Sequence, residues 1–530
     1  MPVPELFSKY RKLVDLRSNW ESHWQEIADF VLPKRADVNK ERSRGDKRTE
    51  FIYDGTALHA LDLLSSSLHG MLTNAATPWF SLRYKDPELS TDENNEWLES
   101  ANQAMYIAFD RSNFQQEVHE LYLDLCAFGT ACMFIEKDNE DLLRFTTRHI
   151  KEIYVQENSK GRIDTVFRKC KMQARNVVEM FGEANVGRRI TKLADEDPYM
   201  ELDIIHAVMP NDEANPYKMD NKNMPFVSVY FDPEDMSEIS VGGFEEFPYL
   251  IPRWSKSSNE VYGRSPSMIA LADIKMLNKM SETTIRAAQK QIDPPLLVPD
   301  DSFILPIKTT PGGLNFYRSG SRDRIEPLMI QANTPVGLNM EEQRRQAIRQ
   351  AYFVDQLLME QSVQMTATEV MKRNEEKMRL LAPVLGRLQA EMLRPLISRS
   401  FAILMRQGML PPAPEGLQGL EIDIEYVSPL AKAQRGQDVQ AIVQAMEILA
   451  PLNQVAPVMD ILDTDAMAAH ITDVLGVPSK VLRSNTEITE IRESRQQAAQ
   501  DQQDIDQASQ VAKAAGQSTP ALKEVIGGEG

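Results

Sequence analysis

The spacing of hydrophobic residues predicts helices in the first part of the chain. Residues 8–32 carry apolar side chains at every third or fourth position, as an amphipathic helix does, and Pro33 ends the pattern. The same spacing recurs over 56–72, where Asp54 or Thr56 can cap the helix, and over 91–110 and 114–128. The basic segment 34–48 lacks this periodicity, so we interpret it as an exposed loop.

Shorter, partly alternating runs predict strands after these helices. They lie at 131–136, 153–156 and 163–169, with others near 201–209, 225–231 and 247–252. Residues 232–246 are acidic and contain no base, which favours a solvated loop. The predicted fold class is therefore α+β and mainly helical.

The middle of the chain predicts two long helices around a small β-module. Ser265 is an N-cap followed by Pro266, and this helix runs to about residue 291, where Asp293-Pro294-Pro295 stops it. Residues 294–335 are rich in turns, with strands expected at 296–298 and 314–317. A second helix begins near residue 339 and reaches about 359.

A third long helix is predicted after a short polar break at 360–365. The capping box Thr366-Ala367-Thr368-Glu369 opens it, and Pro383 and Pro395 must bend it before it ends near residue 407. Its heptad-spaced Met and Leu residues favour packing within one subunit over a coiled coil. A strand at 421–427 and a helical region over 431–482 follow, before a Gln-rich polar tail.

Composition and charge exclude some classes of protein. The chain has 530 residues, 59 Lys and Arg against 78 Asp and Glu, and a formal net charge of −19, which argues against tight binding of nucleic acid. No stretch approaches the roughly 18 apolar residues of a membrane span. Three cysteines, Cys126, Cys132 and Cys170, fit buried thiols in a reducing compartment.

Motifs for catalysis are not found in the sequence. It contains neither a phosphate-binding loop nor a zinc-protease helix motif, and its Cys and His residues lack metal-ligand spacing. We therefore predict no catalytic residue, no metal, no cofactor and no enzyme activity. Two alternatives remain open: a metal-dependent nuclease that uses the acidic 232–246 stretch, and a helical scaffold that binds partners through the Met/Leu stripe.

Several segments, in order, resemble the portal, or head-to-tail connector, proteins of T7-like short-tailed bacteriophages. They are WQEIADFVLP (24–33), FIYDGT (51–56), ALDLLSSSLHGMLT (60–73), PWFSL (78–82), YGRSP (262–266), ADIK (272–275), MTATE (365–369) and GQD (436–438). The resemblance implies a ring, commonly of twelve subunits, at one capsid vertex through which double-stranded DNA enters and leaves. It also implies contacts with the terminase motor, tail adaptor proteins, and major capsid and scaffolding proteins. The protein would then reside in the virion, and in the host cytoplasm during assembly, without a membrane.

The resemblance also implies a division of the chain into the parts of a portal subunit. The expected parts are an N-terminal wing (1–263), a stem helix (264–292), a clip (293–335), a second stem helix (336–358), a tunnel loop (359–366), a wing segment with the long kinked helix (367–428), and a helical crown with a polar tail (429–530).

Candidate DNA contacts follow from this division. Sparse cations on the stem can touch passing phosphates: Lys275, Lys279, Arg286, Lys290, Arg344, Arg345 and Arg349. Gln361, Ser362 and Gln364 are the candidate tunnel-loop residues, and Pro383 is the candidate helix kink. The alternative role for the cations is salt bridging between subunits, with Glu282, Glu341 and Glu342. Twelve chains of −19 would carry roughly −228, which favours DNA as cargo in transit over DNA as a bound ligand.

Overall fold

The computed structural model divides the chain into two compact units. Unit 1 comprises Met1–Ser81, Ser100–Pro412 and Ile424–Leu430, and unit 2 comprises Leu82–Glu99, Ala413–Asp423 and Ala431–Gly530. The residues that the structure describes are 2–40, 43, 45–84, 92–215, 218, 220–221, 223–298, 307–308, 314–316, 325–328, 334–357, 379–414, 422–426, 439, 441–449, 451, 463–475, 483, 487–498, 500, 502 and 505.

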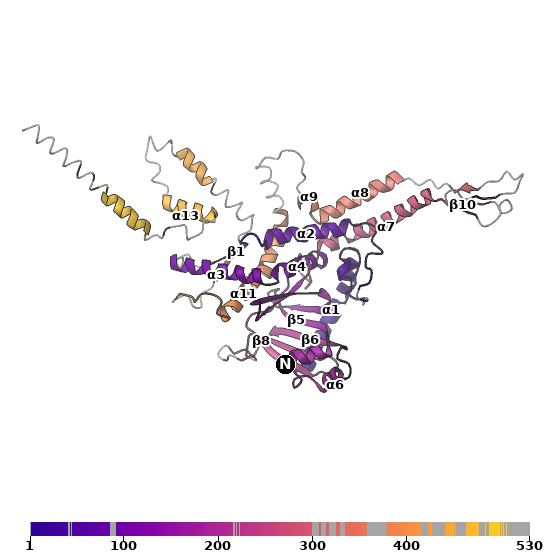
Figure 1. Ribbon diagram of the computed structural model, residues 1–530, viewed down its shortest axis with the longest axis horizontal. Coiled ribbons are helices and arrows are strands. Elements are labelled where there is room, and N and C mark those ends of the chain that lie inside the picture. The colour runs from indigo at the N-terminus through magenta and orange to yellow at the C-terminus, as the bar shows by residue number, and fades with distance from the viewer. Residues whose placement is uncertain are drawn as a thin grey trace, which may run out of the picture. The chain divides into compact units, whose positions relative to one another are not determined.

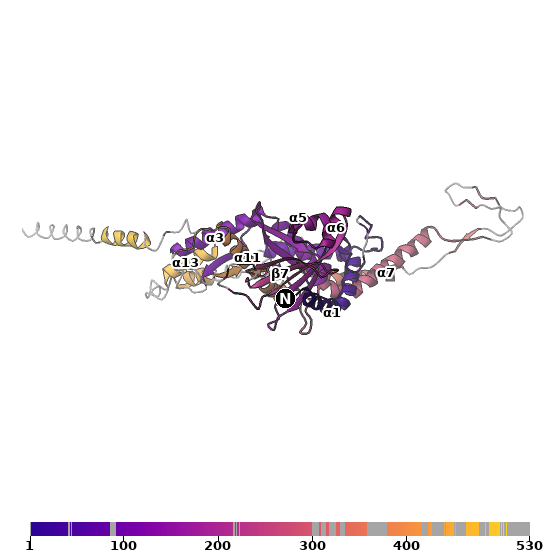
Figure 2. The same cartoon turned by 90° about the horizontal axis from the view of Figure 1, so that it is seen from below.

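A five-stranded antiparallel sheet forms one layer of unit 1. Its strands follow the chain in the order β4 (Ile153–Glu157), β5 (Ile163–Gln173), β6 (Glu201–Pro210), β7 (Phe226–Phe231) and β8 (Glu238–Phe244). Helix α1 (Val3–Phe30) covers one face, with Tyr10 against Phe167 and Ile205. Helices α5 (Ala174–Phe181) and α6 (Arg188–Glu196) cover the other, where Ile204 is buried. Figure 2 shows these helices on opposite sides of the sheet. Successive side chains of β6 point to opposite faces of the sheet, so this strand contributes to the hydrophobic core on each face.

A second, three-stranded sheet joins this layer to a group of helices. It has the order β3 (Leu143–Arg148), β2 (Cys132–Lys137), β9 (Tyr249–Leu250). Helix α2 (Thr56–Leu72) packs against α4 (Phe114–Phe128), and α4 packs against α7 (Pro266–Ile292). All three cysteines are free and buried.

Two glycines allow the end of α4 to meet the start of α7. Gly129 ends α4 with φ +77°, and a Cβ on it would collide with the carbonyl of Gly263. Ser265 caps α7 by accepting from the Met268 amide at 3.1 Å, and its hydroxyl donates to the Ala127 carbonyl at 2.7 Å. The hydroxyl of Ser267 donates to the Cys126 carbonyl at 2.8 Å. The YGRSP segment therefore fixes α7 onto the last turn of α4.

Helices α7 and α8 (Thr334–Ala351) run side by side and project from the rest of unit 1 (Figure 1). Two short strands lie between α7 and α8 in the sequence. They are β10 (Leu296–Leu297) and β11 (Glu326–Pro327), and they pair with each other in antiparallel orientation. The strand expected at 314–317 is wrong for residues 314–316, which are described and form none. The second helix was expected as one piece, but it ends at Ala351 and resumes as α9 (Val354–Leu357), because Phe353 adopts φ +59°.

The third long helix is interrupted by a π-helical turn just before Pro395, its second proline. Residues 379–388 are helical, Gln389–Leu393 form a π-helical turn, and α11 (Arg394–Arg406) follows. Pro395 cannot donate to a carbonyl one turn back, and the wider turn lets the Arg394 amide bond to Gln389 instead. The capping box at 366–369 lies outside the described residues, and a kink at Pro383 stays a prediction.

The remaining elements belong wholly or partly to unit 2. Helix α3 (Asp92–Arg111) and strand β12 (Ile422–Tyr426) agree with the sequence pattern, and β12 pairs with β1 (Phe80–Tyr84). In the C-terminal region, residues 441–449, α13 (Thr464–Leu475) and residues 487–498 are helical.

The acidic stretch 232–246 is not the solvated loop that its composition predicts. It contains strand β8, and Asp232 is fully buried and pairs with Arg189. Glu245 and Glu246 pair with Arg406 of α11 at 2.5 and 2.6 Å. Arginines distant in sequence neutralise these carboxylates, so local composition could not reveal the partners.

The described residues of the basic segment 34–48 form a largely exposed loop, as predicted, but several of its bases pair with carboxylates. It begins with a short 3-10 helix, Pro33–Arg35. The Arg35 guanidinium contacts Glu120 at 2.8 Å and the fully buried Asp124 at 3.2 Å, both on α4. Burial raises the pKa of Asp124 to about 7, and no described group hydrogen-bonds to its carboxylate.

Three buried arginines join elements that are far apart in the sequence. Arg17 of α1 donates to the carbonyls of Ile150 and Ile153 at 3.0 and 2.7 Å. Arg399 of α11 donates to the Ile135 carbonyl of β2 at 3.0 Å. These bonds tie α1 and α11 to the sheets.

Arg253 is the third of these arginines, and its side chain is only 2% exposed. It pairs with Glu157 at the end of β4 and, at 2.7 Å, with Glu391 in the π-helical turn. It also donates to the carbonyls of Val261 and Gly161, both at 3.1 Å. One guanidinium thus holds four segments together.

We expect Arg253→Met to lower the free energy of unfolding by about 3–5 kcal/mol, because it leaves Glu157 and Glu391 without their buried partner. Urea unfolding followed by tryptophan fluorescence measures this loss. The matched control is Arg406→Met, whose partly exposed ion pairs should contribute about 1 kcal/mol or less. Equal losses in the two variants would contradict the role assigned to Arg253.

A pH-dependent prediction follows from Asp124. Since its folded-state pKa lies above the ordinary value, the folded chain keeps a proton that the unfolded chain loses, and Asp124 destabilises the fold progressively between about pH 4 and 7. Asp124→Asn should remove that loss of stability. The difference in melting temperature between the variant and wild type should therefore grow as pH rises to about 7 and stay constant at higher pH. Asp110→Asn, at an exposed position on α3, should keep the wild-type profile. Melting curves from pH 4 to 8 measure both.

Candidate nucleic-acid interface

The predicted DNA-contacting cations lie on the projecting pair α7–α8, which is closed by polar contacts along its length. Thr284 of α7 donates to Glu341 of α8 at 2.6 Å, and Arg344 of α8 pairs with Asp273 of α7 at 2.7 Å. Glu341 is almost fully buried although it is charged. The two helices therefore pack as one hairpin rather than as two independent arms.

The cations of α7 form ion pairs within the chain. Lys275 pairs with Glu26 of α1 at 3.1 Å, while Lys279 and Arg286 share Glu282 at 2.8 and 2.6 Å. The hydrogen bond from Lys279 lowers the pKa of Glu282, which keeps this carboxylate ionised. Lys290 is exposed and pairs with no carboxylate among the described residues.

The cations of α8 are engaged in the same way. Besides the Arg344 pair, Arg345 contacts Asp54 at 3.0 Å and Glu341 at 3.1 Å, and Arg349 lies 3.8 Å from Glu342. Burial alone would raise the pKa of Asp54, but bonds from Thr56 and Arg345 lower it. The carboxylates named as partners in neighbouring subunits are thus paired within one chain, and DNA contact by the cations stays a prediction.

Two apolar faces lie on opposite sides of the hairpin. Met276 and Ile285 of α7 are 50% and 42% exposed and nine residues apart, which is about 900° of helix, or half a turn net. On α8, Met340 and Leu338 are 47% and 53% exposed and about 160° apart. Sequence periodicity did not predict these faces, because it could not tell which apolar residues the core would cover.

The first of these, the Met276 face, comprises Ile269, Ala272 and Met276 of α7 with Met340 of α8, all exposed. The Asp273–Arg344 pair belongs to this side, since Asp273 is three residues before Met276 and Arg344 four after Met340.

The second, the Ile285 face, combines α7 and α8 with a loop. The Tyr53 amide donates to Asn278 at 2.7 Å, and Asn278 donates to the Phe51 carbonyl at 2.7 Å. Ile285 lies two helical turns beyond Asn278, so it is on the side of α7 that meets this loop. Leu338 lies two turns before Arg345, which bonds to Asp54 of the same loop, so it is on the corresponding side of α8. The Ile285 face therefore comprises exposed Phe51, Tyr53, Ile285 and Leu338.

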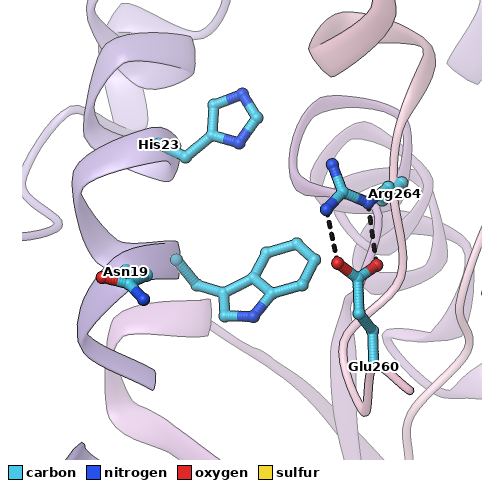
Figure 3. A pocket seen from close by; sticks show the side chains of 5 residues that line it. Asn19, His23, Glu260 and Arg264 are labelled. Carbon is cyan, nitrogen blue, oxygen red and sulfur yellow. Dashed lines mark hydrogen bonds and ion pairs between the residues drawn. The ribbon is translucent and has the colours of Figure 1, made fainter. Parts of the chain in front are cut away.

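A small pocket lies between α1 and the start of α7. It has a volume of about 280 Å³ and is lined by Asn19, Trp20, His23, Glu260 and Arg264 (Figure 3). Arg264 pairs with Glu260 and lies over the Trp20 ring at 5.3 Å, so its charge is already compensated. Burial lowers the pKa of His23.

Neither a metal centre nor a membrane span is found in the part of the chain that the structure describes. Within it, no three His, Cys, Asp or Glu side chains converge on a common point. None of its helices has the length and apolar character to cross a bilayer. The predicted tunnel-loop residues Gln361, Ser362 and Gln364 lie outside the described residues.

Comparison with known proteins identifies the class. Residues 3–482 match the family described as bacteriophage head to tail connecting protein, and the chain belongs to this family. It is 33% identical over 493 residues to the portal protein of Salmonella phage epsilon15, covering 90% of this chain and 88% of that one. It is 31% identical over 496 residues to the probable portal protein of Bordetella phage BPP-1, covering 91% and 89%.

A chain of the virion of a native gene transfer agent particle aligns with 10% identity and a TM-score of 0.36, over 85% of this chain and 99% of that one. This similarity is too weak to bear on the fold. The family assignment confirms the predicted portal role, in the virion at the junction of capsid and tail, within a structural family. The T7-like subtype stays a prediction.

A comparison of Arg345 with Lys290 tests whether ion pairs within the chain make a cation important for stability. Arg345 has such pairs, and Lys290 has none among the described residues. Arg345→Met should lower the free energy of unfolding by about 1–3 kcal/mol, because Asp54 and Glu341 lose a charged partner. Lys290→Met should change it by about 0.5 kcal/mol or less. Urea unfolding of the two variants measures the difference, and a large loss for Lys290→Met would contradict the assignment.

Proposed function

We propose that copies of this chain close into a ring, of about twelve as the family resemblance implies, that conducts double-stranded DNA during packaging and ejection. The hairpin α7–α8 acts as the stem, residues 293–335 as the clip, 359–366 as the tunnel loop, and 429–530 as the crown. Residues 1–263 and 367–428 act as the wing. The clip docks the terminase motor and then the tail adaptor proteins, while capsid and scaffolding proteins surround the wing.

The observation that carries the ring is the pair of apolar faces on the hairpin. The Met276 face and the Ile285 face differ in composition and point in opposite directions, so a contact that joins one face to the other has no twofold axis. Packing the Met276 face of one copy on the Ile285 face of the next is a heterologous contact, which generates a ring when the rotation closes. Their Met, Phe and Tyr side chains are typical of interface cores.

Exposed apolar side chains in the clip support its docking role. Leu297 of β10 is 52% exposed, and Leu314 and Phe316 are 74% and 68% exposed. Exposed apolar side chains such as these, among the described residues of 293–335, favour contact with partner proteins.

The alternatives receive less support from the structure. The carboxylates of a nuclease site in 232–246 would need to be free to bind metal, but Asp232, Glu245 and Glu246 pair with arginines. A scaffold that binds through the Met/Leu stripe would need it exposed, but Leu381, Leu388 and Met392 are buried within unit 1. We therefore keep the structural role without catalysis.

The two faces can be tested by single charges. Met276→Glu and Ile285→Glu should each abolish rings, because either change buries an unpaired carboxylate at the contact between copies. Lys279→Gln, on a neighbouring surface of α7, should leave rings intact. Negative-stain microscopy and mass photometry of the full chain measure the outcome.

Mixing the two single variants tests the heterologous contact. The intact Met276 face of one variant can pack on the intact Ile285 face of the other, so the mixture should form dimers that neither variant forms alone. Dimers of Ile285→Glu alone would indicate a twofold contact and contradict the proposal.

A further inference from the structure

The outer edge of α8 carries a row of uncharged amides. Asn339, Gln343, Gln346 and Gln350 are all exposed, and their spacing places them within about 60° of one another. Gln350 is nine residues after Glu341, which bonds to α7, so this amide edge points away from α7.

The opposite edge of the hairpin carries charged side chains, and helix α1 adjoins part of it. Lys275 is nine residues before Thr284, which bonds to α8, so the edge with Lys275, Lys279 and Arg286 points away from α8. Near the base of α7, α1 adjoins this edge through the Glu26–Lys275 pair. The amide edge is exposed at each of its four positions from Asn339 to Gln350, over about 17 Å.

If neighbouring copies cover the two apolar faces, only these two edges are left for the channel and for the outside of the ring. A cation that meets phosphate releases counterions and adds affinity that depends on salt, which holds DNA in place. An amide can also donate hydrogen bonds to phosphate oxygens. Because it carries no net charge, it does so without releasing counterions and without the salt-dependent affinity that this release adds. A row of amides thus allows contact without retention.

We propose that the amide edge of α8, rather than the cations of the stem, is the surface that lines the DNA channel. This inference rests on the proposed ring and names the face of the stem that meets the duplex. The charged edge of α7 then lies on the outer side of the stem, where its paired charges face solvent or the capsid.

Position-specific crosslinking tests the assignment. The native cysteines are buried, so Gln346→Cys and the matched Lys279→Cys each introduce one accessible thiol into the described part of the chain. Each full-length variant is labelled with a photoreactive aryl azide, assembled into particles, filled with DNA and irradiated. Protein–DNA adducts above the unirradiated background are expected from Gln346→Cys, and none from Lys279→Cys.

Adducts from Lys279→Cys, from both variants, or from neither variant in DNA-filled particles would each overturn the inference while leaving the portal role intact. Failure of the proposed function gives a different result, because wild-type chain would then form no rings and its particles would take up no DNA. Ring counts by microscopy and DNA content by absorbance are measured before irradiation.

Discussion

Burial of three guanidinium groups is the constraint on which the rest of unit 1 depends. Arg17, Arg253 and Arg399 leave water almost completely, so their donors must find partners inside the protein. The partners include backbone carbonyls and carboxylates on strands and turns more than ninety residues away in sequence. This requirement sets how α1, α11 and the π-helical turn lie on the sheets, and the sheets and α4 in turn carry the base of the projecting hairpin.

Much of the fold could be predicted because local signals and tertiary packing agree. Helices α2, α4 and α7 have clear apolar stripes and ends defined by Ser265, Gly129 or proline, and their bounds match within a few residues. Strand β8 was missed because Gly242 and Gly243 weaken its pattern and flanking acids hide it. The break after α8 depends on the left-handed backbone of Phe353, a non-glycine residue whose identity gives no such signal.

The candidate site could be predicted only in part, for a different physical reason. The positions of the cations on α7 and α8 followed from helical spacing, but their partners did not, because Glu26 and Asp54 are hundreds of residues from Lys275 and Arg345. Paired and unpaired cations look alike in a sequence, and so do covered and exposed apolar residues such as Ile274 and Met276. Three-dimensional contacts separated them and showed that amides, not charges, occupy the outer edge of α8.

The contact between Gly129 and Gly263 has a consequence for how variants of this protein behave. Neither position can accept even a methyl group without moving backbone, and together they join the last turn of α4 to the first residues before α7. A substitution there would tilt the α7–α8 hairpin relative to the sheets without touching any surface residue. In a genetic screen such alleles would imitate interface defects, although the surfaces that meet other molecules would be unchanged in sequence.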